Sequence, residues 1–165
     1  MERFSNEYVN LIKQVKKELS TLDMYKTEDC LFMYSETPSF SAGHFSLFLI
    51  DDKPTGERKL FKKTWDNEYD LNRFSSGIYN LDRLCIKTRG IAFSSNQQIE
   101  YERILNNIRF IPEDLEAKGY LLLDGTQYEL GIRIKNTFKK YEWKLATKEF
   151  DYFKPLIEFL TTVAQ

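Results

Sequence analysis

The chain has 165 residues, of which 42% are hydrophobic and 15% aromatic, with 24 basic and 25 acidic side chains. This apolar content offsets the entropy of ordering, which excludes a disordered chain, and the length fits one domain over residues 1–165 with a single core. The charges are nearly balanced and mixed along the sequence, so net charge gives no long-range attraction to nucleic acid or to an anionic membrane.

Residues 5–22 and two later apolar runs give the first predicted elements. Residues 5–22 are predicted to form an amphipathic helix, because apolar residues recur at three- and four-residue steps: Tyr8, Leu11, Ile12, Val15, Leu19 and Leu22. The runs "CLFMYS" (30–35) and "HFSLFLI" (44–50) indicate two strands. The second is apolar at both alternating positions from Leu47 to Ile50, which predicts a central strand.

Turn residues organise the middle of the chain. In "DDKPTGER", Pro54 and Gly56 predict a hairpin whose second arm begins at "KLFKKTW" and continues into "TWDNEYDLNR" (64–73). "LCIKT" and "IAF", on either side of Arg89 and Gly90, suggest a second short hairpin. Ser94 or Ser95 is then a candidate cap for a middle helix with a weak apolar stripe formed by Ile99, Ile104, Leu105 and Ile108.

The last third of the chain carries the strongest local signal. Pro112 opens a predicted helical turn, "PEDLEAKG", and Asp124-Gly125 in "LLLDGTQYELGIRI" favours a two-residue hairpin turn. Its register pairs Leu121 with Tyr128 and places six side chains on one core face: Leu121, Leu123, Tyr128, Leu130, Ile132 and Ile134. "YEWKL" adds a strand, and a final helix begins near Pro155. The predicted fold is a single α+β domain whose mainly antiparallel sheet, built from hairpins, packs with N-terminal, middle and C-terminal helices.

The stretch "TWDNEYDLNR" carries three acids at every second position. On a strand, Phe61, Trp65, Tyr69 and Leu71 point one way, and Asp66, Glu68 and Asp70 the other. We interpret this as an amphipathic strand, and Asp66, Glu68 and Asp70 as the candidate partner-binding residues. A helix is the alternative, because Asp and Asn have poor β propensity. A calcium loop fails, because Leu71 stands where such a loop needs glycine and Gly77 where it needs glutamate.

Patterns typical of enzymes are weak. Asp124 followed by Glu142-Trp143-Lys144 resembles the metal-binding signature of a large nuclease fold. A complete predicted strand separates the two parts. We expect Ile132 and its neighbours opposite Glu142, and these offer no second acid. His44 is the only histidine, and no acid is marked as its orienting partner. Cys30 and Cys85 lie in apolar, core-like runs and cannot complete a zinc site with one histidine. We therefore predict no catalytic residue, no metal ligand set and no cofactor.

Further patterns bear on localisation and on nucleic acid. "KNTFKKYEWK" (135–144) interleaves basic and aromatic residues, but Tyr141 and Trp143 are expected to face the core, so nucleic-acid binding is not predicted. The N-terminus has no secretory pattern, and the apolar run of residues 45–50 is far shorter than the roughly 20 residues a membrane span needs. We expect a cytoplasmic, reduced protein without membrane contact, with a disulfide as the alternative.

The hairpin "LLLDGTQYELGIRI", the strand "YEWKL" and the terminal helix "PLIEFL" together resemble the small cytoplasmic immunity proteins of bacterial toxin systems. The resemblance implies binding to a cognate toxin and obstruction of its active site or of substrate access. The prediction is a non-catalytic protein-binding module of the immunity type, with a basic toxin domain as partner. The alternative is a metal-dependent hydrolase or nuclease that uses the scattered carboxylates.

Overall fold

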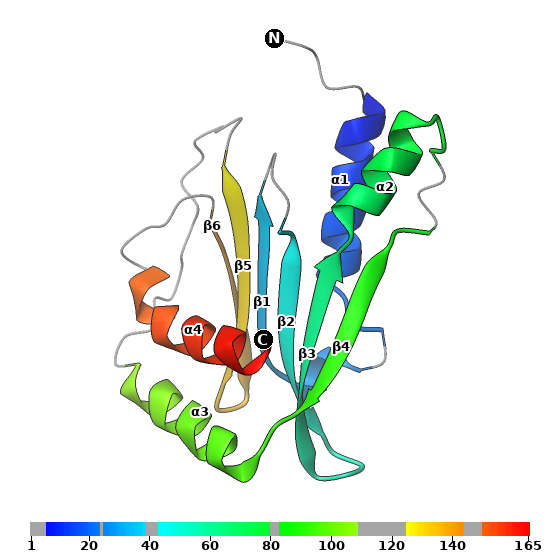
Figure 1. Ribbon diagram of the computed structural model, residues 1–165. Coiled ribbons are helices and arrows are strands. Elements are labelled where there is room, and N and C mark those ends of the chain that lie inside the picture. The colour runs from blue at the N-terminus through cyan, green and yellow to red at the C-terminus, as the bar shows by residue number, and fades with distance from the viewer. Residues whose placement is uncertain (1–5, 24, 39–42, 80–82, 109–124, 144–149) are drawn as a thin grey trace.

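The computed structural model describes residues 6–23, 25–38, 43–79, 83–108, 125–143 and 150–165. In this part of the chain, six strands pair antiparallel into one sheet, in the order β4-β3-β2-β1-β5-β6 (Figure 1). The strands are β1 Cys30–Pro38, β2 Phe45–Asp52, β3 Glu57–Trp65, β4 Ile86–Ala92, β5 Thr126–Ile134 and β6 Thr137–Trp143. The helices are α1 Asn6–Leu19, α2 Asn67–Ser75, α3 Ser95–Asn107 and α4 Lys154–Val163, with short 3-10 turns η1 Thr27–Asp29 and η2 Phe150–Tyr152. The predicted α+β fold is confirmed.

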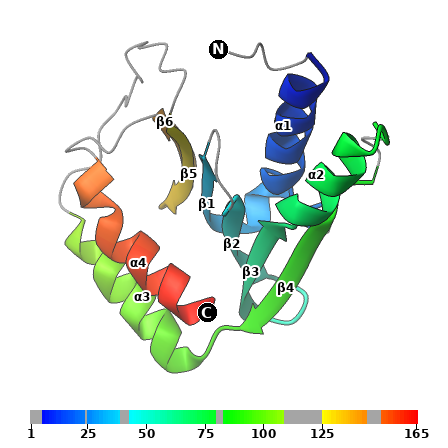
Figure 2. The ribbon, with the colours of Figure 1, turned by 45° about the horizontal axis from the view of Figure 1, so that its top comes forward.

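Both faces of the sheet are covered by helices. Figure 2 shows α3 and α4 side by side on one face, with α1 and α2 on the other. The main core lies under α3 and α4 and includes Leu47, Leu49 and Leu130 from the sheet. Residues 47–50 of β2 are buried on both faces, which confirms β2 as a central strand. No helix among the described residues is both long and apolar enough to span a membrane.

Helix α1 confirms the first predicted element, with a shorter C-terminal end. Leu11, Val15 and Leu19 form its buried stripe. The helix ends at Leu19, where Lys63 of β3 donates to the carbonyl oxygen of Glu18 in the last turn and to that of Thr21 just beyond the helix. The chain then turns toward β1. Lys63 therefore fixes the end of α1 to the sheet.

The turn between β2 and β3 and the cap of α3 are also as predicted. Gly56 has φ +68° and donates to the carbonyl of Asp52 at 2.8 Å, as a tight turn requires. Ser94 caps α3, and Gln97 completes a reciprocal capping box. The predicted stripe of α3 is partly wrong, because Ile99 is 66% exposed and Tyr101 is the buried residue.

The predicted hairpin around Arg89 and Gly90 is wrong. Residues 86–92 form one uninterrupted strand, β4, which pairs with β3 and places Gly90 opposite Phe61. A Cβ atom at Gly90 would lie 3.1 Å from Cε1 of the Phe61 ring. This glycine therefore marks the close approach of an aromatic ring and not a change of chain direction.

The register of β5 corrects the predicted hairpin around Asp124. Tyr128 pairs with Glu36 of β1 and with Trp143 of β6, so both of its edges are occupied and the predicted pairing of Tyr128 with Leu121 is wrong. The two-residue turn that the structure shows joins β5 to β6, and Lys135 takes φ +56° there. Asp124 itself and the helical turn expected at Pro112 lie outside the described residues. The shared core face is confirmed for Tyr128, Leu130, Ile132 and Ile134.

Candidate functional site

The predicted acidic strand is in fact the junction between β3 and α2. The strand ends at Trp65, Asp66 is the N-cap residue, and α2 begins at Asn67. The continuation of the strand through Leu71 is therefore wrong, and the helical alternative holds. An N-cap aspartate followed by acids in the first turn is a helix-start signal that was visible in the sequence. The alternating charges gave a false strand pattern because on a helix Asp66 and Asp70, four residues apart, share one side and Glu68 lies on the other.

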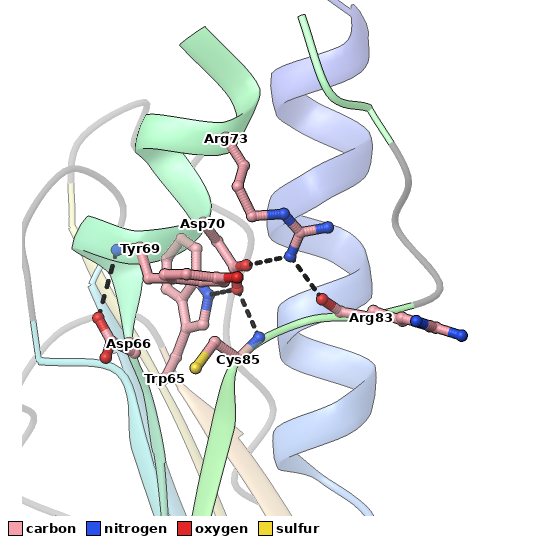
Figure 3. Close-up of polar contacts among 7 residues, drawn as sticks. All are labelled: Trp65, Asp66, Tyr69, Asp70, Arg73, Arg83 and Cys85. Atoms are coloured by element: carbon pink, nitrogen blue, oxygen red, sulfur yellow. Dashed lines mark hydrogen bonds and ion pairs between the residues drawn. The ribbon is translucent and has the colours of Figure 1, made fainter. Parts of the chain in front are cut away.

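Asp70 is buried at the centre of this junction (Figure 3). Its carboxylate accepts hydrogen bonds from Nε1 of Trp65 at 2.8 Å and from the backbone N–H of Cys85 at 2.7 Å. Arg73 donates to the other oxygen of Asp70 at 2.9 Å and to the carbonyl of Arg83 at 2.7 Å. These bonds satisfy the carboxylate and tie α2 to the end of β3 and to the start of β4. Asp70 therefore has a structural role.

Asp66 and Glu68 have different environments from Asp70. Asp66 accepts a hydrogen bond from the backbone N–H of Tyr69 at 3.3 Å and forms an ion pair with Lys87 at 2.7 Å. The hydrogen bond from Lys87, with that from Tyr69, lowers the pKa of Asp66 below its ordinary value. Glu68 is exposed. The three carboxylates do not project together, so Glu68 alone presents a free acidic side chain on α2.

The second acidic pattern also differs from the prediction. Glu142 pairs with Glu129 and not with Ile132, so a second acid does lie opposite it. Glu129 accepts hydrogen bonds from Ser20 at 2.8 Å and from Ser35 at 3.3 Å. Within the residues that the structure describes, no group of three or more His, Cys, Asp or Glu side chains is arranged to hold a metal ion.

His44 is buried against Trp65, with ring centroids 4.9 Å apart and an edge-on geometry. Within the described ranges neither of its ring nitrogens makes a well-formed hydrogen bond, and the backbone carbonyl of Pro38 is only a weak partner. Burial and the positive charge of Lys16 lower its pKa to about 4, although the carbonyl of Pro38 acts in the opposite direction. The imidazole is therefore neutral at neutral pH, and no acid among the residues that the structure describes orients it for proton transfer.

The two cysteines differ in environment. Cys30 is buried in β1, and burial raises its pKa to about 11, which keeps the thiol protonated at neutral pH. Cys85 is half-buried and directly precedes β4, so its predicted place inside a strand is off by one residue. Both thiols are free, and the disulfide alternative is wrong in this structure.

The alternation along residues 135–144 correctly predicted which aromatic side chains face the core. Tyr141 and Trp143 are buried in the main core, where Trp143 stacks on Tyr128 with ring centroids 5.6 Å apart. Lys139 and Lys140 are neighbours on one strand and so project from opposite faces of the sheet. In this structure Tyr141 and Trp143 offer no open ring for a base to stack on.

An exposed apolar surface on α1 and α2 was missed by the sequence analysis. Six large apolar or aromatic side chains are exposed in the described residues, and four of these lie on α1, on α2 or directly after α2: Val9, Tyr69, Ile78 and Tyr79. Phe74 links the two helices through ring contacts with Tyr8 at 6.3 Å and Tyr79 at 5.1 Å. We call Val9, Glu68, Tyr69, Ile78 and Tyr79 the α1–α2 surface.

The exposure of Tyr69 overturns its predicted place beside Trp65. The strand pattern placed both side chains on the buried face, whereas Trp65 is 6% exposed and Tyr69 is 55% exposed. Helical spacing, which brings Tyr69 next to Arg73, was the available signal, and the guanidinium of Arg73 lies 5.5 Å from the centre of the Tyr69 ring.

Comparisons with known proteins found no match: no family model matches the chain, and no curated protein matches it.

Proposed function

We propose that this chain is a non-catalytic protein-binding module of the immunity type, which binds and neutralises a basic toxin domain through the α1–α2 surface. The observation that carries the proposal is the exposure of Tyr69 and Tyr79, at 55% and 57%, on α2 and directly after it, with the exposed acid Glu68 next to Tyr69 in the sequence. Tyrosine is enriched at the centres of protein interfaces, because its ring gives a large contact area and its hydroxyl a hydrogen bond.

In this proposal Tyr69 contributes binding affinity, and Glu68 attracts and orients the basic partner. Tyr69 sits over Arg73, which is itself held by Asp70, so the ring is supported on one side before a partner arrives. A supported side chain loses less conformational entropy on binding. Glu68 supplies a negative charge for attraction to a basic partner, whereas Asp66 is already paired with Lys87 and Asp70 is buried.

If the gene directly upstream of this one encodes a toxin domain, that domain is the partner to test. Titration calorimetry of the two purified proteins should give one-to-one binding, and the complex should lose the enzymatic activity of the toxin. Tyr69→Ala and Tyr79→Ala should each weaken binding about 30-fold or more, as a loss of about 2 kcal/mol at an interface centre implies. Tyr152→Ala is the matched control, because Tyr152 is a 44% exposed tyrosine on η2, outside the α1–α2 surface.

Several outcomes contradict this proposal. One is an upstream gene that encodes no toxin domain, and another is unchanged binding by both tyrosine variants. The sequence alternative is supported instead if the purified chain binds no such partner and cleaves nucleic acid with magnesium. That cleavage should then disappear in Glu129→Gln or Glu142→Gln, since these two acids lie opposite each other on β5 and β6.

A further inference from the structure

A cavity of about 340 Å³ opens on the face of the sheet that α1 covers, beside the segment that joins α1 to β1. Its apolar floor is formed by Met33, Phe48 and Ile50 of the two central strands, and Tyr25 and Phe138 line its sides. The cavity shares no residue with the α1–α2 surface, so nothing in the toxin-binding proposal explains it.

The wall on the β6 side is fixed by a glycine. The Phe138 ring lies across Gly131 of β5, where a Cβ atom would come within 2.5 Å of the ring atom Cζ. The guanidinium of Arg133 lies 5.4 Å from the centre of the same ring, and Nε of Arg133 donates to the carbonyl of Cys30 at 3.0 Å. Phe138 is thereby held against the sheet at the side of the cavity and not across it.

The opposite wall is anchored to the sheet at several points. Lys63 donates to the carbonyl of Thr21 at 2.6 Å, and Ser20 donates to Glu129 at 2.8 Å. The Tyr25 ring packs on Phe61 with centroids 5.4 Å apart. Because both walls are held by contacts outside the cavity, the space between them is a built feature of the fold.

The rim of the cavity is more basic than acidic. Lys26 and Lys140 line it, against a single acid, Asp23. Lys140 is exposed and has no ion pair within the described part of the chain, and Lys26 lies 4.0 Å from Glu28. Cys30 lies in the inner wall, and the positive charges of Arg133 and Lys140 are close enough to act against the rise in its pKa that burial causes. An anionic group at the rim would find an unpaired ammonium next to an apolar floor.

We propose that this cavity binds a small apolar carboxylate, with its hydrocarbon part on Met33, Phe48 and Ile50 and its carboxylate at Lys140. The cavity volume of about 340 Å³, at ~30 Å³ for each water-sized group, holds about ten non-hydrogen atoms. A straight chain of eight carbons with one carboxylate has this size. The bound carboxylate stays at the rim, where water completes its solvation, so the charge is not buried.

Calorimetric titration with octanoate, octanol and protonated octylamine tests the proposal, because the three probes share a chain and differ in charge. Octanoate should bind one to one, and both other probes should bind at least about fivefold more weakly, the factor that an exposed ion pair worth about 1 kcal/mol gives. Lys140→Met should remove this preference while octanol binds as before. Lys139→Met is the matched control, because Lys139 is the adjacent residue on the opposite face of β6.

Labelling of the two cysteines by iodoacetamide locates the bound probe, and it is followed at about pH 9 because burial keeps the Cys30 thiol protonated and slow to react at neutral pH. Cys30 lines the cavity and Cys85 does not, so octanoate should slow the labelling of Cys30 and leave that of Cys85 unchanged. A Cys30→Met variant that melts as the native chain does should bind octanoate at least about tenfold more weakly, because the longer side chain enters the cavity. The proposal is wrong if octanoate does not bind, if octylamine binds more tightly, if Lys139→Met acts like Lys140→Met, or if Cys30 is not protected.

Discussion

The buried histidine makes the stability of this protein depend on pH in a predictable direction. His44 has its pKa lowered to about 4 from an ordinary value of 6.5. Between these two values the unfolded chain binds a proton that the folded chain does not, so the free energy of unfolding falls as the pH falls. The stability is fully present above pH 6.5 and is lost progressively down to about pH 4, below which His44 causes no further loss.

The magnitude follows from the size of the pKa shift. A shift from 6.5 to about 4, at about 1.4 kcal/mol for each unit, corresponds to roughly 3 kcal/mol as an upper bound. The substitution His44→Phe removes the titrating group and two nitrogens that make no well-formed hydrogen bond in the described residues, while it keeps a flat ring for the edge-on contact with Trp65. We expect the variant to be at least as stable as the native chain at pH 7.5.

Urea unfolding of both proteins at several pH values between 7.5 and 4 measures this effect. The difference between the two proteins cancels the titration of the carboxylates they share, and it should grow in favour of His44→Phe by up to about 3 kcal/mol toward pH 4. A difference that stays constant with pH would refute the reasoning. A loss of more than about 2 kcal/mol in the variant at pH 7.5 would also refute it, since it would show that the imidazole makes a hydrogen bond the fold needs.

The remaining predictions concern α2 and β4. Asp70→Ala should lower the free energy of unfolding by about 3 to 5 kcal/mol in urea, because it leaves a buried indole N–H, a backbone N–H and Arg73 without their acceptor. Gly90→Val should cost about 1 to 3 kcal/mol, since its side chain meets the Phe61 ring, whereas Thr88→Val, at an exposed position of the same strand, should change stability by less than about 0.5 kcal/mol. Glu68→Lys, in the first turn of α2, should lower stability by less than about 1 kcal/mol. It should slow association with a basic partner and weaken the dependence of that rate on salt in stopped-flow measurements.

The sequence predicted the elements whose signals are local. The β-favouring runs of β1 and β2, the turn at Pro54 and Gly56, the stripe of α1 and the cap at Ser94 are each set by neighbouring residues, and each is confirmed. These signals need only the chain periodicity and the chemistry of the cap or turn.

The errors arose where contacts between distant segments decide the structure. Gly90 was interpreted as a turn, because the ring of Phe61 that needs the space comes from another strand. The register that places Glu129 opposite Glu142 depends on the turn at Lys135, whose left-handed backbone no glycine signalled. The cavity likewise joins residues of the α1–β1 link, the central strands and β6, which no local pattern brings together.

Trp65 lies at the start of the segment 64–73 that was wrongly predicted as a strand, and its contacts hold the helix that carries the proposed binding surface. Its indole N–H binds Asp70, its ring packs on His44, and it belongs to the cluster that α1 contributes through Leu11 and Val15. The position of α2, and with it the exposure of Tyr69, therefore depends on the buried Asp70 and on the N-cap Asp66, and not on the exposed Glu68. Asp70→Ala should weaken partner binding together with stability, whereas Glu68→Lys should act mainly on the association rate. If Asp70→Ala leaves partner affinity intact in a protein that is still folded, the α1–α2 surface is not the binding site.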